Sequence, residues 1–442
     1  MAPAVHSTRI AYYGDDFTGA TDALATATQG GLRTLLFLCI PTPDMLAASG
    51  DLDCIGIAGA ARSMEPDDME NELRPVAEYF AKINAPVVHY KTCSTFDSSP
   101  QVGNIAVAIR VMSEAIPGRF IPIVGGQPNI GRYCVFGHLF AAAGTGGPVF
   151  RIDRHPTMSC HPVTPMTESD LALHLERQGL ERVTSVPYPA YEAPSEAIDQ
   201  IIEQTIADGG RMLLFDVTRP ADLAPVGRII WQEASQRRLI AVGPSGVMQA
   251  LCAHWHEAGQ VAAPSGSTRV SAADGPVFVL AGSLSSVTRQ QIEAASDFAR
   301  VLIDAARLSR GDPDHVAALV RQVSEIINSG RSVIAHTTPL RDDPVAEESL
   351  SGLELAKETG KFVARLLFDV RLRRLGVAGG DTSSWILRAL DVWGLSFKGH
   401  LSPGVALCRA HSHDENLDEI EVMLKGGQMG PPDLFRRLLK GT

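Results

Sequence analysis

Short apolar runs of β type alternate with helical stretches along nearly all of the 442-residue chain. The expected strands in the first part of the chain are 10–13, 34–38, 54–58, 87–90, 120–124, 212–217 and 239–242. Those in the second part are 277–280, 301–303, 332–335, 375–377, 405–409 and 420–424. Helical patterns such as 103–114, 170–177, 315–328 and 353–372 separate many of these strands. Alternation of this kind is typical of parallel sheets covered by helices, so we expect an α/β fold.

The length exceeds that of one ordinary domain, and a hydrophobic content of 45% supplies material for more than one core. The segment 261–275 is rich in small and polar residues, contains Pro and Gly, and has little to bury. We therefore expect two parallel-sheet α/β domains, residues 1–262 and 276–442, joined by a linker at about 263–275.

Charge and cysteine usage narrow the class of partner. A net charge of −11 argues against nucleic acid or an anionic membrane as the main partner. The seven cysteines are scattered without a CxxC pair, which argues against a disulfide framework or a zinc site. His155 and His161 lack a third residue at a spacing that would complete a metal site, so no metal ligand is assigned. The N-terminus lacks a secretion signal and no long apolar run occurs, so we expect a cytoplasmic protein.

Polar side chains follow several expected strands of the first domain. Because ligands bind beyond the carboxyl ends of parallel strands, these turns are candidate binding loops. Asp15 and Asp16 follow the first strand and open a helix, where they act as helix caps or as catalytic carboxylates. The remaining candidate side chains of this domain are Arg62, Lys91, Ser94, Thr95, Asp97, Asn104 and Arg132. This mixture of carboxylates, hydroxyls and cations suits a polyhydroxylated acid.

The second domain carries loops of glycine and hydroxyl residues instead. Residues 378–384 (AGGDTSS) lie between a short apolar run and a helical stretch, a pattern typical of a phosphate-binding helix start. Two further turns, 282–288 and 425–428, have similar composition. The expected nucleotide-binding residues in these turns are Ser283, Ser285, Gly379, Gly380, Asp381, Thr382, Lys425, Gly426 and Gly427. Asp381 either contacts Mg²⁺ or caps its helix.

A reaction between a sugar-like acid and a nucleotide, held in a cleft between the domains, is the simplest function that needs both sets of loops. Phosphoryl transfer fits, because it depends on positioning, Mg²⁺ and charge stabilisation. The chain has no GxxxxGK[ST] motif and no GxGxxG after a strand, which excludes the classical P-loop and argues against a dinucleotide fold.

In this order and spacing, the motifs resemble those of the four-carbon acid sugar kinase family. The resemblance rests on 15–20, 282–291, 379–383, 403–405 and 425–430, and it adds Gly404 to the nucleotide-binding residues. It implies an N-terminal acid-sugar-binding domain, a C-terminal nucleotide-binding domain, and ATP with Mg²⁺. Typical members carry a Lys-Lys-x-Asp-Ser-Thr-x-Arg-Gly-Asn segment; here the stretch is KTCSTFDS (91–98), rejoining the pattern at Gly103-Asn104.

We therefore expect an ATP-dependent kinase that phosphorylates a terminal hydroxyl of a small sugar acid. Lys91, Arg132 and Arg62 would bind the substrate carboxylate, and Asp15 or Asp16 would deprotonate the attacking hydroxyl. A nicotinamide-dependent oxidoreductase and a non-catalytic sugar-acid or nucleotide-binding protein remain as alternatives. The substrate is left open among threonate, erythronate, 3-oxo-tetronate and a branched relative. The altered segment favours a keto or branched acid, and a homodimer is left open.

Overall fold

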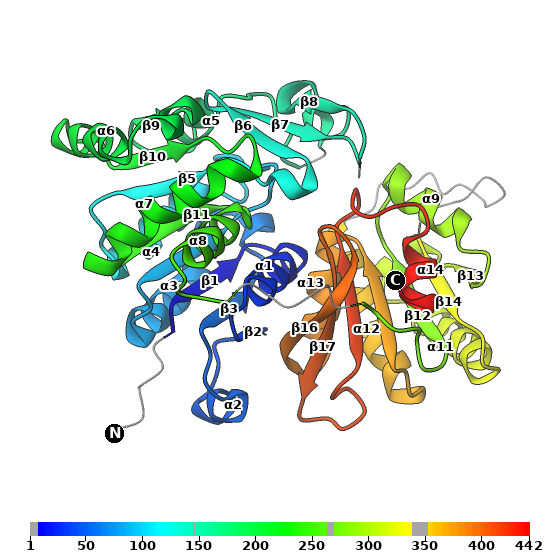
Figure 1. The fold of residues 1–442 in the computed structure, drawn as a ribbon. Coiled ribbons are helices and arrows are strands. Elements are labelled where there is room, and N and C mark those ends of the chain that lie inside the picture. Colours follow the sequence, from blue (N-terminus) through cyan, green and yellow to red (C-terminus); the bar gives the residue numbers. More distant parts are fainter. Residues whose placement is uncertain (1–7, 145, 162, 263–268, 338–351) are drawn as a thin grey trace. The chain divides into compact units, whose positions relative to one another are not determined.

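The computed structural model describes residues 8–144, 146–161, 163–262, 269–337 and 352–442, apart from the side chains of Leu353 and Asp381. The chain divides into two compact units, Met1–Ser265 (unit 1) and Gly266–Thr442 (unit 2). Buried apolar side chains form a core cluster within unit 1, and another cluster lies within unit 2. Both units are mixed α/β structures built on mainly parallel strands, as expected (Figure 1).

The strands of unit 1 are β1 (Ile10–Gly14), β2 (Thr34–Phe37), β3 (Cys54–Ala58), β4 (Val87–Lys91), β5 (Ile121–Val124), β6 (Arg132–Val135), β7 (His138–Ala142), β8 (Val149–Arg151), β9 (Val183–Val186), β10 (Met212–Phe215) and β11 (Leu239–Gly243). The helices are α1 (Phe17–Gln29), α2 (Pro43–Ser49), α3 (Pro66–Ile83), α4 (Ile105–Ala115), α5 (Leu171–Glu176), α6 (Ser195–Ala207), α7 (Leu223–Gln236) and α8 (Gly246–Glu257). A 3₁₀ turn, η1 (Ala61–Ser63), follows β3.

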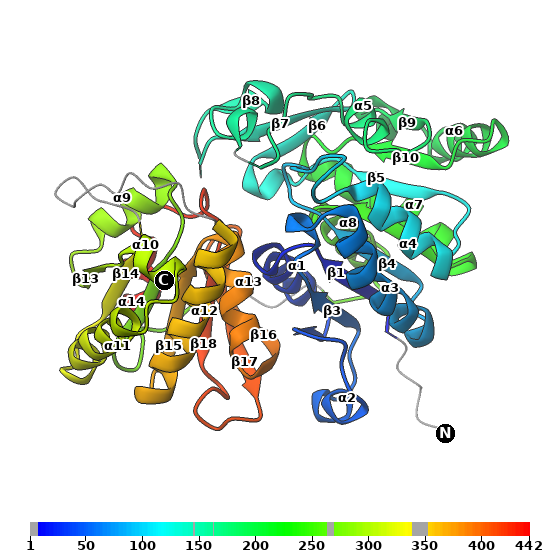
Figure 2. The same ribbon diagram turned by 180° about the vertical axis from the view of Figure 1, so that it is seen from behind.

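The main sheet of unit 1 has the strand order β2-β3-β1-β4-β11-β5-β10-β9, and its neighbouring strands pair in parallel. Helices α1, α7 and α8 cover one face and α3 and α4 the other (Figures 1 and 2). Strands such as β1 and β4 are buried along their whole length, which explains their continuous apolar runs.

The strand order of unit 1 reverses direction at β1. Strands β3 and β2 lie on one side of β1, and β4, the next strand along the chain, lies on the other. Gly14, the last residue of β1, is in register with Ala58 of β3 and Lys91 of β4. Such a switch point is where open parallel sheets bind ligands.

An antiparallel sheet of β6, β7 and β8 follows β5 and was not expected from the sequence. Its strands are short and its β6–β7 turn has only two residues, Phe136 and Gly137. The buried Asp216 carboxylate fixes this turn by accepting hydrogen bonds from the Phe136 N–H (2.7 Å) and the Gly137 N–H (2.9 Å). This anchoring places Arg132, the first residue of β6, beyond the carboxyl end of β5.

The strands of unit 2 are β12 (Val277–Ala281), β13 (Ala299–Leu302), β14 (Val333–His336), β15 (Arg374–Ala378), β16 (Val392–Ser402), β17 (Val405–Ser412) and β18 (Glu421–Lys425). The helices are α9 (Ser286–Ala294), α10 (Ala305–Ser309), α11 (Pro313–Asn328), α12 (Gly352–Asp369), α13 (Gly380–Ala389) and α14 (Leu434–Lys440).

The sheet of unit 2 has the parallel order β13-β14-β12-β15-β18. Its strand order reverses at β12, in the same way as the order of unit 1 reverses at β1. The expectation of a purely parallel sheet needs one correction, because β17 and β16 extend this sheet as an antiparallel hairpin. Strand β16 was missed because glycines, polar residues and register shifts interrupt its apolar pattern.

The ordered start of unit 2 precedes the expected domain start at residue 276. Val270 is buried, and its N–H and C=O bond to the Thr442 hydroxyl and the Thr442 N–H. The Ala273 N–H donates to the Leu439 carbonyl (2.8 Å). Residues 270–273 therefore pack with the C-terminal residues of unit 2, although their composition suggested a linker; 263–268 lie outside the described residues. In the part of the chain that the structure describes, no helix combines the length and apolar character needed to cross a membrane.

Candidate active site

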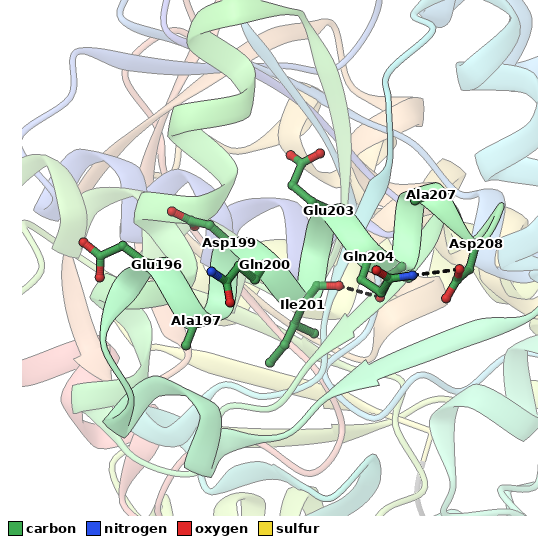
Figure 3. A pocket seen from close by; sticks show the side chains of 10 residues that line it. Glu196, Ala197, Asp199, Gln200, Ile201, Glu203, Gln204, Ala207 and Asp208 are labelled. Atoms are coloured by element: carbon green, nitrogen blue, oxygen red, sulfur yellow. Dashed lines mark hydrogen bonds between the residues drawn. The ribbon is translucent and has the colours of Figure 1, made fainter.

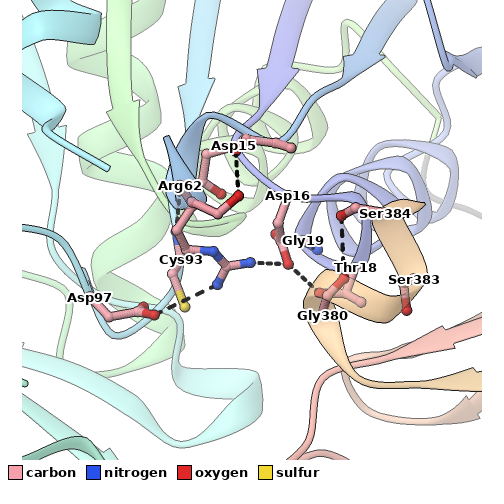
Figure 4. A network of polar contacts seen from close by, with 12 residues as sticks. Asp15, Asp16, Thr18, Gly19, Arg62, Cys93, Asp97, Gly380, Ser383 and Ser384 are labelled. Atoms are coloured by element: carbon pink, nitrogen blue, oxygen red, sulfur yellow. Dashed lines mark hydrogen bonds and ion pairs between the residues drawn. The ribbon is translucent and has the colours of Figure 1, made fainter. Parts of the chain in front are cut away.

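Asp15 lies at the switch point of unit 1, directly after β1, and is buried. Its N–H donates to the Lys91 carbonyl (3.0 Å) and its carbonyl accepts from the Arg62 N–H (3.1 Å), so the loops after β1, β3 and β4 are tied together. The carboxylate Oδ2 accepts a hydrogen bond from the Cys93 N–H (3.3 Å, Figure 4). Oδ1 is buried and has no hydrogen-bond partner among the described residues.

The neighbouring carboxylate, Asp16, is fully engaged. It is the N-cap of α1, where Oδ1 accepts from the Gly19 N–H (2.8 Å) and Oδ2 accepts from the Thr18 hydroxyl. Oδ2 also forms an ion pair with the Arg62 guanidinium (Figure 4). Asp16 therefore combines the capping role and the charged role that its sequence position suggested.

Opposite pKa shifts separate the two carboxyl groups. Burial raises the pKa of Asp15 to about 7; the positive charge of Arg62 limits this rise, and the charge of Asp16 adds to it. Burial also acts to raise the pKa of Asp16, but Arg62, Lys91 and two hydrogen bonds outweigh it and lower that pKa. Asp16 is thus held as an anion, whereas Asp15 exchanges a proton near neutral pH.

Two cations lie beside these carboxylates. Arg62, in η1, pairs with Asp16 and also with Asp97, whose Oδ2 lies 3.9 Å from Nη1. Lys91 ends β4 and is buried. Its ammonium lies against the first turn of α1, because a Cβ added to Gly19 would be 2.3 Å from Lys91 Nζ. The switch point therefore offers fixed positive charge to an anionic ligand.

The altered segment 91–98 forms a tight loop after β4. The Thr95 hydroxyl donates to Asp97 Oδ1 (2.8 Å), and the Cys93 thiol lies 3.1 Å from that hydroxyl. Phe96 adopts a left-handed conformation (φ 52°), and its carbonyl accepts a hydrogen bond from the Ser98 hydroxyl (2.8 Å). This unusual turn brings Asp97 to Arg62. Burial, with the charge of Asp97, raises the pKa of Cys93 to about 12, so the thiol is neutral.

Arg132 is a buried cation at the same edge of the sheet. Its Nη1 donates to the carbonyls of Ile130 (3.1 Å), Gly131 (3.3 Å) and Ala142 (3.2 Å). Its Nε is buried without a partner among the described residues. Burial lowers the pKa of Arg132, whereas the neighbouring Cys93 and Asp97 act to raise it. The guanidinium is therefore fixed near the altered segment.

The structure thus gathers most of the expected side chains of unit 1 around one switch point, namely Asp15, Asp16, Arg62, Lys91, Thr95, Asp97 and Arg132. Ser94 lies half-buried in the same loop. Asn104 has another place: its Oδ1 caps α4 through the Val107 N–H (3.1 Å), and its Nδ2 donates to the carbonyls of Pro100 (3.2 Å) and Gln178 (3.1 Å).

A second polar cluster at this edge was not assigned from the sequence. Asp22 Oδ2, on α1, accepts hydrogen bonds from Gln127 Nε2 (2.9 Å) and the Ser245 hydroxyl (2.6 Å). Ser245 follows β11, so applying the rule of strand ends to β11 would have found it. Thr18 and Gly19, which bind Asp16, could have been found from the spacing of a helix cap.

In unit 2, the loops after β12, β15 and β18 meet at one edge of the sheet. Ala378 of β15 is in register with Ala281 of β12 and Lys425 of β18. Backbone bonds join the loops: the Ser283 N–H donates to the Ala378 carbonyl (3.1 Å) and the Gly379 N–H to the Lys425 carbonyl (2.9 Å). Gly379 precedes α13 with a φ of 137°, a conformation that favours glycine.

Glycines allow these loops to pack closely. A Cβ on Gly282 would lie 2.4 Å from the Thr382 hydroxyl, and one on Gly427 would lie 2.4 Å from the Ser283 hydroxyl. The Ser285 hydroxyl caps α9 at the Thr288 N–H (3.1 Å) and donates to the Gly427 carbonyl (2.5 Å). The backbone of these loops is therefore held in the compact form that a phosphate-binding loop requires.

Lys425 is a buried cation at the centre of these loops. Its Nζ donates to the Thr288 hydroxyl (2.8 Å) and the Gly427 carbonyl (3.3 Å), and no carboxylate pairs with it among the described residues. Burial lowers the pKa of Lys425 to about 7. A buried amine without a counter-ion is a suitable partner for an anionic phosphate.

The remaining expected residues of unit 2 lie on the same loops. Gly380 begins α13 and Gly426 follows β18. Gly404 forms the turn between β16 and β17, and the pairing of Leu407 with Met423 places this turn beside the end of β18. Asp381 lies in α13, but its side chain is outside the described part of the chain.

A surface hollow along α6 offers a contrasting environment (Figure 3). Its lining carboxylates are Glu196, Asp199, Glu203 and Asp208. This surface would repel an anion, so it does not compete with the cationic loops for an acidic substrate. No group of three or more His, Cys, Asp or Glu side chains suited to a metal ion occurs within the described residues.

Comparison with known proteins places these two sites in a family. A family model described as a sugar-binding N-terminal domain matches residues 10–251, and one described as a nucleotide-binding C-terminal domain matches residues 278–435. The chain is 37% identical to a 3-oxo-isoapionate kinase of Paraburkholderia graminis, with 98% of this chain and 94% of that protein covered. It is 29% identical to a 3-oxo-tetronate kinase of Cupriavidus necator, with coverages of 96% and 95%.

Solved structures share the fold. A Salmonella typhimurium protein has a TM-score of 0.78 at 24% identity, covering 97% of this chain and 98% of that one. A Haemophilus influenzae protein has a TM-score of 0.69 at 22% identity, with the same coverages. The chain belongs to the four-carbon acid sugar kinase family, which joins a sugar-binding N-terminal domain to a nucleotide-binding C-terminal domain.

Proposed function

We propose that this protein is an ATP-dependent kinase that transfers a phosphoryl group to a terminal hydroxyl of a small sugar acid. One observation carries the proposal: each unit has a distinct anion-binding constellation at its switch point. In unit 1, carboxylates are combined with Arg62, Lys91 and Arg132; in unit 2, glycine loops surround the buried Lys425. The names of the relatives, which are kinases of 3-oxo acids, support it.

In unit 1, the substrate carboxylate would bind to the cationic side chains. Arginine suits this role because its planar guanidinium donates in two directions to a carboxylate. A carboxylate from Asp15 or Asp16 would accept the proton of the attacking hydroxyl, which requires a separation of about 3 Å.

In unit 2, the phosphates of ATP would bind at the loops after β12, β15 and β18. Backbone N–H groups at the start of α13 and around Gly426-Gly427 would donate to phosphate oxygens, and Lys425 would balance their charge. The close packing at Gly282 and Gly427, where a Cβ would lie 2.4 Å from a hydroxyl oxygen, and the φ of 137° at Gly379 fit such a cradle. Mg²⁺ would neutralise charge on the phosphates, held largely by the nucleotide itself.

We further propose that the acceptor is a 3-oxo sugar acid. The relatives named above are a 3-oxo-isoapionate kinase and a 3-oxo-tetronate kinase. Of these two proteins, the 3-oxo-isoapionate kinase is the more similar to this chain in sequence. The altered segment 91–98, with a neutral thiol at Cys93, favours a substrate that has a carbonyl in place of one hydroxyl.

The two alternative functions are less consistent with these findings. An oxidoreductase would need a dinucleotide site, and the chain lacks the usual fingerprint after its strands. A buried carboxyl group whose pKa is raised to about 7, as for Asp15, is typical of a catalytic base and favours an enzyme over a non-catalytic protein.

The decisive experiment measures ADP release with ATP, Mg²⁺ and a panel of acids: 3-oxo-isoapionate, 3-oxo-tetronate, threonate and erythronate. We expect the highest kcat/KM with a 3-oxo acid, and loss of activity in the Lys425→Met variant. ADP release that no acid stimulates above the rate of ATP hydrolysis would refute the kinase assignment.

A further inference from the structure

Two charged side chains beyond the carboxyl ends of the unit 1 strands each hold a buried polar atom that has no partner among the described residues. These atoms are Asp15 Oδ1, an acceptor, and Arg132 Nε, a donor. An unpartnered buried polar group destabilises the protein, so its persistence at a binding loop indicates a ligand group that completes it. Arg119 also has such an Nε, but it precedes β5 at the opposite edge of the sheet and pairs with Glu203.

Asp15 and Asp16 differ in what they can still accept. Both oxygens of Asp16 are occupied by the Gly19 N–H, the Thr18 hydroxyl and Arg62. Within the described part of the chain, the Asp15 carboxylate accepts a hydrogen bond from the Cys93 N–H alone, through Oδ2. A base needs a free lone pair within hydrogen-bond reach of the proton that it removes, and Asp15 Oδ1 has one.

The charges around Asp15 come from each element packed against it. They are Arg62 of η1, Asp16 at the start of α1, Lys91 of β4 and Asp97 of the following loop. The titratable side chains of Tyr90 and Cys93, which are neutral at pH 7, complete the surroundings. Arg62 and Lys91 favour the anion, whereas burial and the carboxylates disfavour it. Their balance leaves Asp15 able both to accept and to release a proton at neutral pH.

Arg132 is arranged to receive an anion. Three backbone carbonyls fix its Nη1, and no carboxylate pairs with it among the described residues. The charge of Asp97 acts on Arg132 and also on Asp15, so the altered segment lies near both groups. A hydroxy acid has groups that complement the two unpartnered atoms. Its hydroxyl can donate a hydrogen bond to Asp15 Oδ1, and its carboxylate can accept one from Arg132 Nε.

We propose, resting on the kinase function above, that the substrate binds with its reacting hydroxyl on Asp15 and its carboxylate on Arg132, and that Asp16 positions Arg62. As the hydroxyl oxygen forms its bond to the γ-phosphorus of ATP, its proton passes to Asp15 Oδ1. The bond from the γ-phosphorus to the β,γ-bridging oxygen breaks, and ADP leaves with that electron pair. The middle carbons of the acid then lie beside the altered segment.

The first arm of the test compares Asp15→Asn with the matched variant Asp16→Asn. We expect Asp15→Asn to lower kcat by about 10²–10⁴-fold and to remove the acidic limb of the kcat–pH profile. Asp16→Asn should keep that limb, raise KM for the acid and lower the melting temperature, because Arg62 loses its ion pair with Asp16 and keeps only the longer contact with Asp97 among the described residues. If the Asp15→Asn variant does not fold, Asp15→Ser takes its place in the comparison. Binding of ADP to each variant checks that unit 2 is still folded. An acidic limb retained in the Asp15 variant and lost in the Asp16 variant would overturn the assignment.

The second arm compares Arg132→Gln with Arg238→Gln. Arg238 is a matched control, since its guanidinium also donates to backbone carbonyls, those of Ala85, Ala81 and Phe80. Each variant is assayed with the preferred acid and with the carboxamide of that acid. We expect Arg132→Gln to reduce the acid-to-amide ratio of kcat/KM at least tenfold, and Arg238→Gln to preserve it. A ratio unchanged by Arg132→Gln would overturn the orientation, whereas a wild-type enzyme inactive on every acid would instead refute the kinase function.

Discussion

At the scale of single residues, Lys425 illustrates how a binding group reduces the stability of the free protein. Its pKa is lowered from 10.5 to about 7 by burial. Between these values the unfolded chain binds more protons than the folded protein does. The unfolding free energy therefore rises as the pH rises from about 7 to about 10.5, by at most about 1.4 kcal/mol per pH unit, and the penalty is complete below pH 7.

Lys425→Met should remove this penalty. We predict a higher melting temperature than wild type at pH 7 without nucleotide, a difference that shrinks by pH 9.5, and loss of ADP binding. Thermal melts at both pH values, together with calorimetric titration of ADP, check the prediction. A variant that is destabilised at pH 7 would show that the buried ammonium contributes net stability through its bonds to Thr288 and Gly427.

Cys93 is the residue of the altered segment at which specificity is best tested. It stands where the family pattern has an acid, and its backbone N–H binds Asp15. A carboxylate at this position would lie near Arg132 and Arg62, and would accept hydrogen bonds from substrate hydroxyls. We predict that Cys93→Asp lowers the preference for a 3-oxo acid over threonate or erythronate by about tenfold or more. Ratios of kcat/KM measure this, and Cys93→Ser is the control for loss of the thiol alone; equal ratios in all three proteins would locate specificity elsewhere.

The sequence predicted which residue types gather at the switch point of unit 1, but not how they pair. Asp15 and Asp16 were recognisable from a strand end followed by a helix start. The ion pair between Arg62 and Asp97 could not be predicted, because it depends on the left-handed turn at Phe96. A bulky aromatic residue gives no signal for positive φ, and the turn is stabilised by hydrogen bonds to Ser98 and to His174 of the distant helix α5.

At the scale of elements, the first turn of α1 places a helix cap beside Lys91, a proposed substrate-binding cation. Gly19 donates its N–H to Asp16, and a Cβ at residue 19 would lie 2.3 Å from Lys91 Nζ and 2.4 Å from Asp16 Oδ1. We predict that Gly19→Ala raises KM for the acid at least tenfold by displacing the ammonium. The melting temperature should not fall greatly, since alanine favours a helix over glycine by up to about 1 kcal/mol. Steady-state kinetics with the acid and with ATP check this, and an unchanged KM for the acid would show that Lys91 adapts without loss.

Most strands could be predicted because buried parallel strands read as continuous apolar runs. The strands that escaped prediction are the antiparallel β6, β7, β8 and β16 and the short parallel strand β9. Strand β16 carries Gly394, Gly399 and polar residues, and β6 to β8 are short with partly exposed side chains. Their formation depends on partners brought together by the tertiary fold, such as Asp216 for the β6–β7 turn, rather than on local pattern.

At the scale of the whole molecule, the separate cores of the two units predict that unit 2 folds and binds nucleotide without unit 1. The expected phosphate-binding loops, from Gly282 to Gly427, all belong to unit 2. We predict that a fragment 266–442 binds ADP with a Kd within about tenfold of that of the full chain, a factor equivalent to about 1.4 kcal/mol. A fragment 276–442 should be less stable. It lacks Val270, which is buried, and the Ser271 carbonyl, which accepts hydrogen bonds from the buried Arg374 guanidinium. Chemical denaturation of both fragments and ADP titration check these expectations. Binding of ADP to fragment 1–265, with none to 266–442, would reverse the assignment of nucleotide to unit 2.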